Sequence, residues 1–355
     1  MLMSISAITQ KPFGTTAIGE HVTEYTLTNN RGSIAKIINL GGIITELHLR
    51  DRNGALGDLV LGFDTLEPYL QVSPYFGALI GRVGNRIANA QFMLDGEHYC
   101  LAANNGINNL HSGPVGFDKK VWNASAADDV NGPIVKLQLL SEDGDQGFPG
   151  NLDVIVTYQL THDDEVIIDY FATTDKATPV NLTQHSYFNL AAKGDILNHR
   201  MQIFADHINA INENQIPVGE PMPVKNSPFD FRVPRCIGEL IDANHEQIQN
   251  GCGYDHNFLI NQKSPKQLTL AARVEDEGSG RVLEVLTEEP GVQFYSGNFL
   301  DGSLSGKGIV YEKRSGFCLE TQHSPDAINQ PQFPSIVLRP GAEYRTRTVY
   351  KFSTN

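Results

Sequence analysis

Alternation of apolar and polar residues with a period of two recurs along this chain and constrains its fold more than any other feature. In residues 43–50, one alternate set of side chains is mostly apolar and the other mostly polar. Such alternation is typical of a strand with one buried face. The pair Asn53-Gly54 favours a tight hairpin turn, after which residues 58–63 can return beside the first strand. The pattern therefore predicts antiparallel hairpins.

Further strand-like runs predict a fold made almost wholly of β-structure. These runs lie at residues 135–139, 153–160 and 166–173. Helical periodicity is scarce, because residues 64–67 can cap only a short turn before Pro68 and residues 242–249 can form two turns at most. The 33 glycines and 18 prolines are spread along the chain, which fits many turns and offers no interdomain linker. We expect one all-β domain of stacked antiparallel sheets over residues 1–355.

The charge of the chain limits the partners that it can bind. Its 27 lysines and arginines stand against 41 aspartates and glutamates, a formal net charge of -14. Such a surface repels phosphates, so we expect no nucleic-acid or anionic-membrane partner. A neutral or cationic small molecule is favoured instead.

Cysteine spacing and hydropathy indicate the compartment. The four cysteines are far apart and form no C-x-x-C pair, so neither a disulfide framework nor a structural metal site is indicated. Residues 1–11 lack the basic start and apolar stretch of a secretory signal. No segment approaches the roughly 18 to 20 apolar residues that span a bilayer. We expect a soluble, cytoplasmic protein with reduced thiols.

A histidine in the strand-like run 180–190 is the first candidate for chemistry. Alternation predicts that Asn181, Thr183, His185 and Tyr187 share one face of this strand. Neither face of the strand is made only of apolar residues, as a face packed against the core would be. Histidine can give or take a proton near neutral pH, and a rigid strand can hold it in one orientation. The structural alternative is a core histidine that is satisfied by a backbone carbonyl.

Two clusters in the first third of the chain offer hydrogen-bond donors to a ligand. Residues 77–87 hold three glycines and two arginines, but the spacing is not that of a dinucleotide-binding fingerprint. Asn85 and Arg86 can present a fork of donors to ligand oxygens, or Arg86 can satisfy a turn and a carboxylate. His111 lies in a loop with Gly113 and Pro114, where it can point into a cleft.

Three later segments place polar groups in aromatic, strand-prone sequence. They carry Asp255, Gln293 and Glu320. Glu320 follows Phe317-Cys318-Leu319, so a strand can carry its carboxylate into an apolar wall, where burial raises the pKa towards that of a working base. An edge glutamate in water is the alternative.

Metal chemistry has little support in the sequence. His111, His185 and His323 lack the spacing of a zinc site, and the acidic loop at residues 141–150 lacks the pattern and terminal glutamate of an EF-hand. We expect no metal site.

Taken together, these segments resemble the aldose 1-epimerase family, also called galactose mutarotases, over nearly the full length. The resemblance is carried by the following runs: 40–42, 58–63, 76–87, 110–111, 116–118, 178–190, 254–258, 290–295, 316–322 and 338–341. Minor departures are Ser112, in a loop that often has two glycines, and Gln184, where asparagine is common. The matched functional positions are intact.

The resemblance implies a large antiparallel β-sandwich of the galactose mutarotase type, with few short helices and an open sugar cleft. It implies an isomerase that interconverts the α and β anomers of galactose, glucose and related aldoses without a cofactor. By resemblance, Glu320 is the base and His185 the acid. His111 and Arg86 would bind the oxygens whose charge changes during ring opening. The other sugar hydroxyls would be held by Asn85, Asp255 and Gln293.

Three other functions are tested against this interpretation. A sugar-phosphate epimerase needs a cluster of basic residues to bind its phosphate, and this region provides only Arg86 and Arg82. A sugar-binding β-sandwich without catalysis would not need Glu320 and His185. A glycosidase could pair Asp255 with Glu320 across a glycosidic bond. The preferred aldose and the choice between monomer and homodimer are left open by the sequence.

Overall fold

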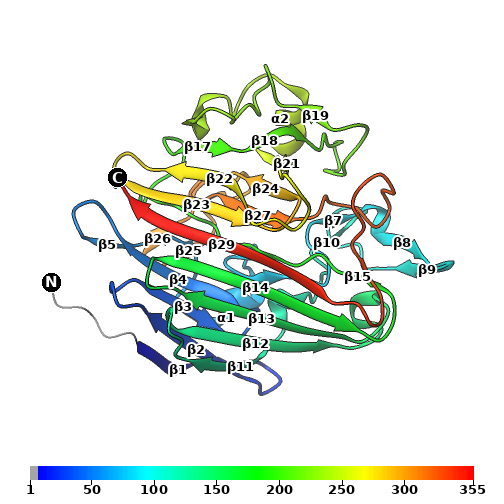
Figure 1. Ribbon diagram of the computed structural model, residues 1–355, viewed down its shortest axis with the longest axis horizontal. Coiled ribbons are helices and arrows are strands. Elements are labelled where there is room, and N and C mark those ends of the chain that lie inside the picture. The colour runs from blue at the N-terminus through cyan, green and yellow to red at the C-terminus, as the bar shows by residue number, and fades with distance from the viewer. Residues whose placement is uncertain (1–6) are drawn as a thin grey trace.

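The computed structural model describes residues 7–355, which form layered antiparallel sheets (Figure 1). Residues 1–6, part of the segment predicted to lack a secretory signal, lie outside the described residues. No helix among residues 7–355 has the length and apolar character needed to cross a membrane.

The largest sheet has nine strands, and the C-terminal strand lies in its middle. That strand, β29, pairs with β14 on one side and β23 on the other, as Figure 1 shows. The spatial order is β11 (Asn123–Ala127), β12 (Ile134–Ser141), β13 (Leu152–Leu160), β14 (Glu165–Thr174), β29 (Tyr344–Thr354), β23 (Arg281–Thr287), β22 (Thr269–Glu275), β17 (Arg200–Ile203) and β20 (Arg235–Cys236).

Two five-stranded sheets accompany it. The first is a meander of β1 (Ala7–Thr15), β2 (His21–Thr28), β3 (Ile34–Ile38), β4 (Ile43–Arg50) and β5 (Leu56–Asp58). The second has the order β19 (Met222–Pro223), β18 (Ala205–Ile208), β21 (Asp255–Ile260), β24 (Gly291–Tyr295) and β27 (Cys318–Gln322).

The remaining elements are short. Two-stranded ribbons pair β6 (Leu79–Ile80) with β16 (Thr183–Gln184), β7 (Arg86–Ile87) with β10 (Asn109–Leu110), β8 (Gln91–Leu94) with β9 (Glu97–Cys100), β15 (Thr178–Pro179) with β28 (Val337–Leu338), and β25 (Ser305–Gly306) with β26 (Ile309–Val310). The α-helices of the described residues are α1 (Leu66–Gln71) and α2 (Glu246–Gly251). Four 3₁₀ turns complete the set, at Ala88–Ala90, Phe117–Lys119, Asp145–Gly147 and Ile237–Glu239.

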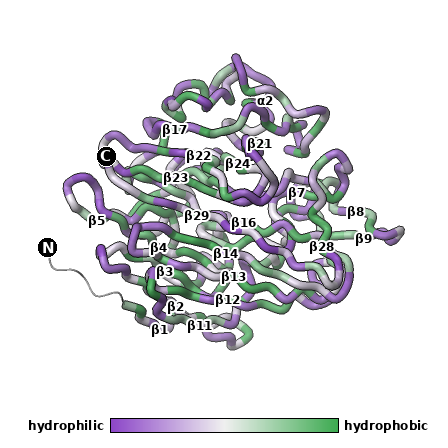
Figure 2. Tube along the Cα trace, viewed as in Figure 1, coloured by the Kyte–Doolittle hydropathy of each residue, from purple (hydrophilic) through white to green (hydrophobic). Residues whose placement is uncertain are grey.

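The main hydrophobic core joins the large sheet to both smaller ones. It contains Leu47 of β4, Leu137 of β12, Leu283 of β23 and Phe294 of β24, all of them buried. Alternate residues of each strand point into this layer, which is the arrangement of a β-sandwich. Figure 2 shows apolar residues along the strands and hydrophilic residues gathered in the outer connections. The predicted all-β antiparallel sandwich is confirmed.

Some of the predicted local elements are confirmed and others are not. The runs 43–50, 135–139, 153–160 and 166–173 are all strands, and the predicted turn at Asn53-Gly54 closes the β4–β5 hairpin. The return strand predicted at residues 58–63 is wrong except at its first residue, because β5 covers Leu56–Asp58. Helix α1 continues through Pro68, which occupies the first turn, where the missing N–H costs no helical hydrogen bond.

Candidate active site

One face of the second five-stranded sheet is polar and buried. Register places Gln293 of β24 opposite both Asn257 of β21 and Glu320 of β27. Residues directly opposite one another share a face, and so do residues two apart. Asp255 therefore belongs to the same face. The alternate residues, such as Phe294, join the hydrophobic core. The sequence predicts an apolar wall around Glu320, but its neighbours on this face are polar; only its burial is confirmed, at 2% exposure.

The segment 180–190 supplies His185, but it is not the long strand that alternation predicts. Only Thr183 and Gln184 are in strand β16. The other backbone groups bond to different neighbours: His185 N–H donates to the Ala78 carbonyl, while Phe188 N–H donates to that of Phe317. The segment is enclosed on all sides, which explains why neither of its faces is a core stripe.

His185 and Glu320 meet in the fold. His185 Nε2 lies 3.6 Å from Glu320 Oε2, and both side chains are buried. Glu320 Oε2 has no hydrogen-bond partner within the described residues. On the other side of the imidazole, the Cys318 sulfur lies 3.5 Å from Nδ1. A buried carboxylate oxygen without a partner costs free energy unless a ligand or proton satisfies it.

Burial shifts the pKa values of this pair towards the uncharged forms. It raises the pKa of Glu320 well above its usual value, with a further increase from the charge of Asp255 and an opposing effect of Arg86. Burial also lowers the pKa of His185 to about 4. The raised pKa of Glu320 agrees in direction with the expectation from sequence.

Asn85 and His111 lie beside the β7–β10 ribbon and are joined by two hydrogen bonds. The Asn85 backbone N–H donates to Nδ1 of His111 over 3.0 Å, and the His111 N–H donates to the Asn85 carbonyl over 2.9 Å. Both residues have positive φ, which asparagine tolerates better than histidine. The His111 ring centroid lies 5.2 Å from that of His185. The two histidines thus share one site.

Arg86, Asp255 and Gln293 are joined by a chain of hydrogen bonds. Gln293 Nε2 donates to Asp255 Oδ1 over 2.7 Å, and Gln215 Nε2 donates to Asp255 Oδ2 over 2.9 Å. Arg86 donates from Nη2 to Gln215 and from Nε to Asn105. Its Nη1 makes no hydrogen bond within residues 7–355, which leaves donors for a ligand. Burial raises the pKa of Asp255, and Arg86 opposes this increase.

The structure assembles all seven residues that the sequence singles out, although none of their roles follows from geometry alone. Each is at most 9% exposed. The open cleft that the resemblance implies stays a prediction.

The residues that could hold a metal differ from those considered in the sequence. The donor atoms of His111, His185 and Glu320 lie within 4.8 Å of one another. His323 is instead bonded to Glu289, with Nδ1 2.6 Å from Oε2. The Nδ1 of His111 already accepts from Asn85, so only its Nε2 could bind a cation. Two imidazoles and a carboxylate suit a divalent transition metal.

Arg82 is part of the scaffold. It is 1% exposed, and its guanidinium donates to Thr178 and to four carbonyls of the loop 141–150. The acidic loop that superficially resembles a calcium site therefore caps a buried arginine. Arg82 has no donor left for a substrate phosphate except its unpaired Nε.

Comparison with known proteins identifies the family. The sequence model described as aldose 1-epimerase matches residues 23–351, nearly the whole chain. The chain belongs to the aldose 1-epimerase family. It is an isomerase by this membership.

Relatives and solved structures of this family cover the chain from end to end. Human galactose mutarotase is 48% identical over 352 residues, which are 98% of this chain and 99% of that protein. The aldose 1-epimerase of Escherichia coli strain K12 is 39% identical over 332 residues, 92% of this chain and 94% of that protein. A crystal structure of galactose 1-epimerase from Lactobacillus acidophilus has a TM-score of 0.87 at 26% identity and covers 99% of this chain and 100% of its own. The β-sandwich is thus of the galactose mutarotase type.

The departures from the aldose 1-epimerase pattern have local structural reasons. The Ser112 hydroxyl accepts from the Val83 N–H and donates to its carbonyl. Gln184 donates to the Gly77 carbonyl and accepts from the Ser186 N–H. Both side chains satisfy buried backbone groups, so the substitutions leave the site residues undisturbed.

Gln215, Tyr75 and Cys318 contact the site without having been assigned a role from sequence. Gln215 connects Arg86 to Asp255 from a loop with no motif. The Tyr75 ring packs against His111, with centroids 4.6 Å apart. Cys318 belongs to the run 316–322 that carries the family resemblance. It lies two residues before Glu320 on the same face of β27, and this spacing in the sequence could have placed it beside Glu320.

Proposed function

We propose that Glu320 and His185 are the acid/base pair that interconverts the α and β anomers of free aldoses. The observation that carries the proposal is the 3.6 Å approach of His185 Nε2 to Glu320 Oε2, an oxygen that has no hydrogen-bond partner in residues 7–355. The two groups are close enough to serve neighbouring oxygens on one sugar ring. Galactose and glucose are the expected substrates, and the galactose mutarotases among the relatives support the first.

Ring opening begins with Glu320 as carboxylate and His185 as imidazolium. Glu320 takes the proton from the anomeric hydroxyl, and the electron pair of that O–H bond becomes the carbonyl π bond. The bond between the anomeric carbon and the ring oxygen breaks, and His185 gives its proton to that oxygen. The aldehyde then rotates, and the former ring oxygen attacks the other face of the carbonyl carbon while His185 takes the proton back from it. The carbonyl π electrons move to the carbonyl oxygen, which takes its proton from Glu320, so the ring closes as the other anomer and both groups return to their starting forms.

The buried pair holds one shared proton throughout this cycle. Before ring opening the proton is on His185, and afterwards it is on Glu320. Burial disfavours the charged arrangement and favours the neutral one, as the pKa shifts of both groups indicate. Forming the charged arrangement therefore costs free energy, and the transfer of protons from it to the neutral arrangement during ring opening is favourable.

The other site residues would bind and orient the sugar. His111 is neutral because burial holds its pKa well below the usual value, and with Nδ1 accepting from Asn85 it can donate from Nε2. Arg86 can donate from Nη1 to an oxygen that gains negative charge. We assign Asn85, Asp255 and Gln293 to the remaining hydroxyls. Their mutual hydrogen bonds would fix the positions of the groups that contact the ring.

Polarimetry tests this function. Purified protein should accelerate the rotation change of fresh α-galactose and α-glucose, and Glu320→Gln or His185→Asn should slow it by roughly 10²–10⁴-fold. Glu289→Gln is a matched control, because Glu289 is also buried beside a histidine but lies outside the seven-residue site. Full activity in both site variants would refute the assigned roles. Sugar binding without acceleration would indicate a non-catalytic protein, and release of a chromogenic aglycone would indicate a glycosidase.

We also propose a location and a state of assembly. The four cysteines of the described chain are free thiols, which supports the cytoplasm as the compartment. We infer that residues 1–355 act as one domain, since the hydrophobic core spans all three large sheets. A monomer or a homodimer fits this arrangement.

A further inference from the structure

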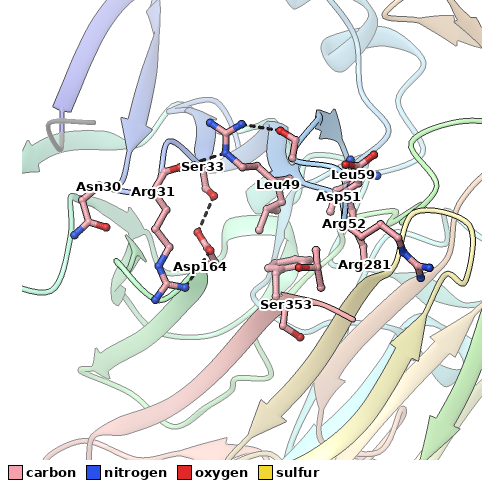
Figure 3. A pocket seen from close by; sticks show the side chains of 14 residues that line it. Asn30, Arg31, Ser33, Leu49, Asp51, Arg52, Leu59, Asp164, Arg281 and Ser353 are labelled. Carbon is pink, nitrogen blue, oxygen red and sulfur yellow. Dashed lines mark hydrogen bonds and ion pairs between the residues drawn. The ribbon is translucent and has the colours of Figure 1, made fainter. Parts of the chain in front are cut away.

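A large cavity lies away from the candidate active site. Its volume is about 920 Å³, and none of the seven site residues lines it. Its walls come from the ends of the β2–β3, β4–β5, β13–β14 and β22–β23 hairpins and from the C-terminal strand β29. Figure 3 shows Arg31 and Asp164 on one side, Arg52 and Arg281 on the other, and Leu49 between them.

The cavity wall is rich in arginine in a strongly acidic protein. Four arginines line it, Arg31, Arg50, Arg52 and Arg281, against two aspartates. Both aspartates are already engaged. Asp164 accepts from the Ser33 hydroxyl and pairs with Arg31, while Asp51 accepts from two N–H groups of its own turn. The positive charge of the wall is therefore only partly neutralised by protein groups.

Among residues 7–355, three of these arginines have no carboxylate within ion-pair distance. Arg50 donates to the Gly54 carbonyl, Arg52 to that of Glu277, and Arg281 to those of Leu190 and Ala55. Carbonyl oxygens satisfy hydrogen bonds but do not cancel a full charge. Elsewhere on the surface most arginines are paired, as Arg339 is with Asp95. The concentration of unpaired guanidinium groups is thus local to this cavity.

Arg281 places a buried positive charge in the wall of the cavity. It is 4% exposed, and its Nε has no partner within the described residues. Burial lowers its pKa, against the attraction of Asp51 and Asp276. A buried charge without an ion pair destabilises a fold unless an opposite charge compensates it. A bound anion would supply that charge.

We propose that this arginine cavity binds a small organic phosphate, at a site separate from the sugar site. Guanidinium forks match phosphate oxygens in geometry and charge. The apolar side chains of Leu49, Leu59 and Phe352 also line the cavity and can cover the organic part of such a ligand. The volume suits a molecule of nucleotide or sugar-phosphate size. The proposal does not depend on the activity of Glu320 and His185.

Titration calorimetry with defined probes tests the proposal. Inorganic pyrophosphate, ADP and glucose 6-phosphate are titrated separately into the full-length protein. All three should give saturable binding that weakens as salt increases, because the contacts are ionic. Tighter binding of ADP than of pyrophosphate would identify a nucleotide as the ligand class. Tighter binding of glucose 6-phosphate would identify a phosphorylated sugar.

The double variant Arg50→Gln/Arg52→Gln removes two charges from exposed positions of the wall, where folding is not at risk. It should weaken binding of pyrophosphate by about tenfold or more, the loss typical of charge-assisted hydrogen bonds. The matched control Arg339→Gln/Arg345→Gln removes two exposed arginines elsewhere and should leave binding unchanged. Mutarotation should be the same in all these proteins.

Three results would overturn the proposal. The first is the absence of saturable binding of every probe at millimolar concentration. The second is an equal loss of affinity in the double variant and its control. The third is displacement of the probe by galactose, which would place the phosphate in the sugar site.

Discussion

The backbone N–H of Asn85 donates to Nδ1 of His111 over 3.0 Å, which fixes the proton of the neutral imidazole on Nε2. Burial holds the pKa of His111 well below its usual value, with the charges of His185 and Arg86 acting in the same direction. The ring is therefore a neutral donor of constant orientation across the physiological pH range.

Replacing His111 by phenylalanine should slow mutarotation without changing its pH dependence. His111→Phe keeps an aromatic ring beside Tyr75 but removes the Nε2–H donor. We expect kcat/KM to fall by about 10²–10³-fold, the usual loss for one donor to a developing charge. Stopped polarimetry between pH 6 and 8 measures this. A loss confined to the acid end of the range would show that His111 acts as a proton donor and would contradict the fixed-donor role.

The pH profile of activity should be bell-shaped because the His185–Glu320 pair must hold one proton. Acidification adds a second proton to the pair and removes the base. Because burial lowers the pKa of His185 to about 4, the acid limb of the profile lies below the usual histidine range. Alkali removes the shared proton, and since the pKa of Glu320 is raised, this limb lies above the usual carboxylate range. Both limbs belong to the coupled pair.

Two substitutions should move the alkaline limb in opposite directions. The charge of Asp255 raises the pKa of Glu320 and that of Arg86 lowers it. Asp255→Asn should therefore shift the limb to lower pH, and Arg86→Gln should shift it to higher pH, whatever their effects on KM. Shifts in the same direction, or none, would disprove this electrostatic coupling.

The fold was predictable because it is recorded in the local pattern of the sequence, whereas the roles of the site residues remain a prediction from the resemblance. Period-two alternation in 153–160 and 166–173 marks strands that bury one face, and the matched runs mark Glu320 and His185. Gln215 could not be found this way. It reaches Asp255 from a loop without regular spacing, and a contact between distant loops leaves no signal in a single sequence.

The segment 180–190 shows where alternation misleads. The pattern there is mixed because both faces are enclosed, so polar side chains such as Gln184 satisfy backbone groups instead of facing water. Arg82 is a second residue whose surroundings the sequence pattern does not reveal, since its hydrogen bonds with the loop 141–150 are all with backbone carbonyls or a hydroxyl group. Such contacts depend on tertiary structure and not on residue spacing.

Arg82→Met should destabilise the fold by at least about 3 kcal/mol, because several buried acceptors would lose their only charged donor. Arg82→Lys should recover part of the loss, since an ammonium group cannot reach the same set of oxygens. Urea unfolding at pH 7 measures both. The exposed pair of Arg339 and Asp95 is the control, and Arg339→Gln should cost less than about 1 kcal/mol. Equal costs for Arg82→Met and Arg339→Gln would exclude a scaffold role.

Buried His256 should make the protein sensitive to acid. Burial lowers its pKa to about 3, and its Nδ1 accepts from the Asp255 N–H. The unfolded chain binds the proton below about pH 6.5 and the folded chain does not, so stability falls as the pH decreases from 6.5 towards 3. Each pH unit costs about 1.4 kcal/mol for this group. In urea unfolding at pH 6, 5 and 4, His256→Gln should show a slope smaller by this amount; an unchanged slope would contradict the prediction.

Zinc should inhibit the enzyme, and chelation should leave it active. The donor atoms of His111, His185 and Glu320 lie within 4.8 Å of one another, so a divalent ion can occupy the groups that must exchange protons with the sugar. Asp58→Asn is the control, since Asp58 belongs to a second potential metal group with Glu46 and His48 outside the site. Inhibition should persist in this variant. If EDTA abolished mutarotation and zinc restored it, the ion would be a catalytic component and the acid/base pair alone would not account for the reaction.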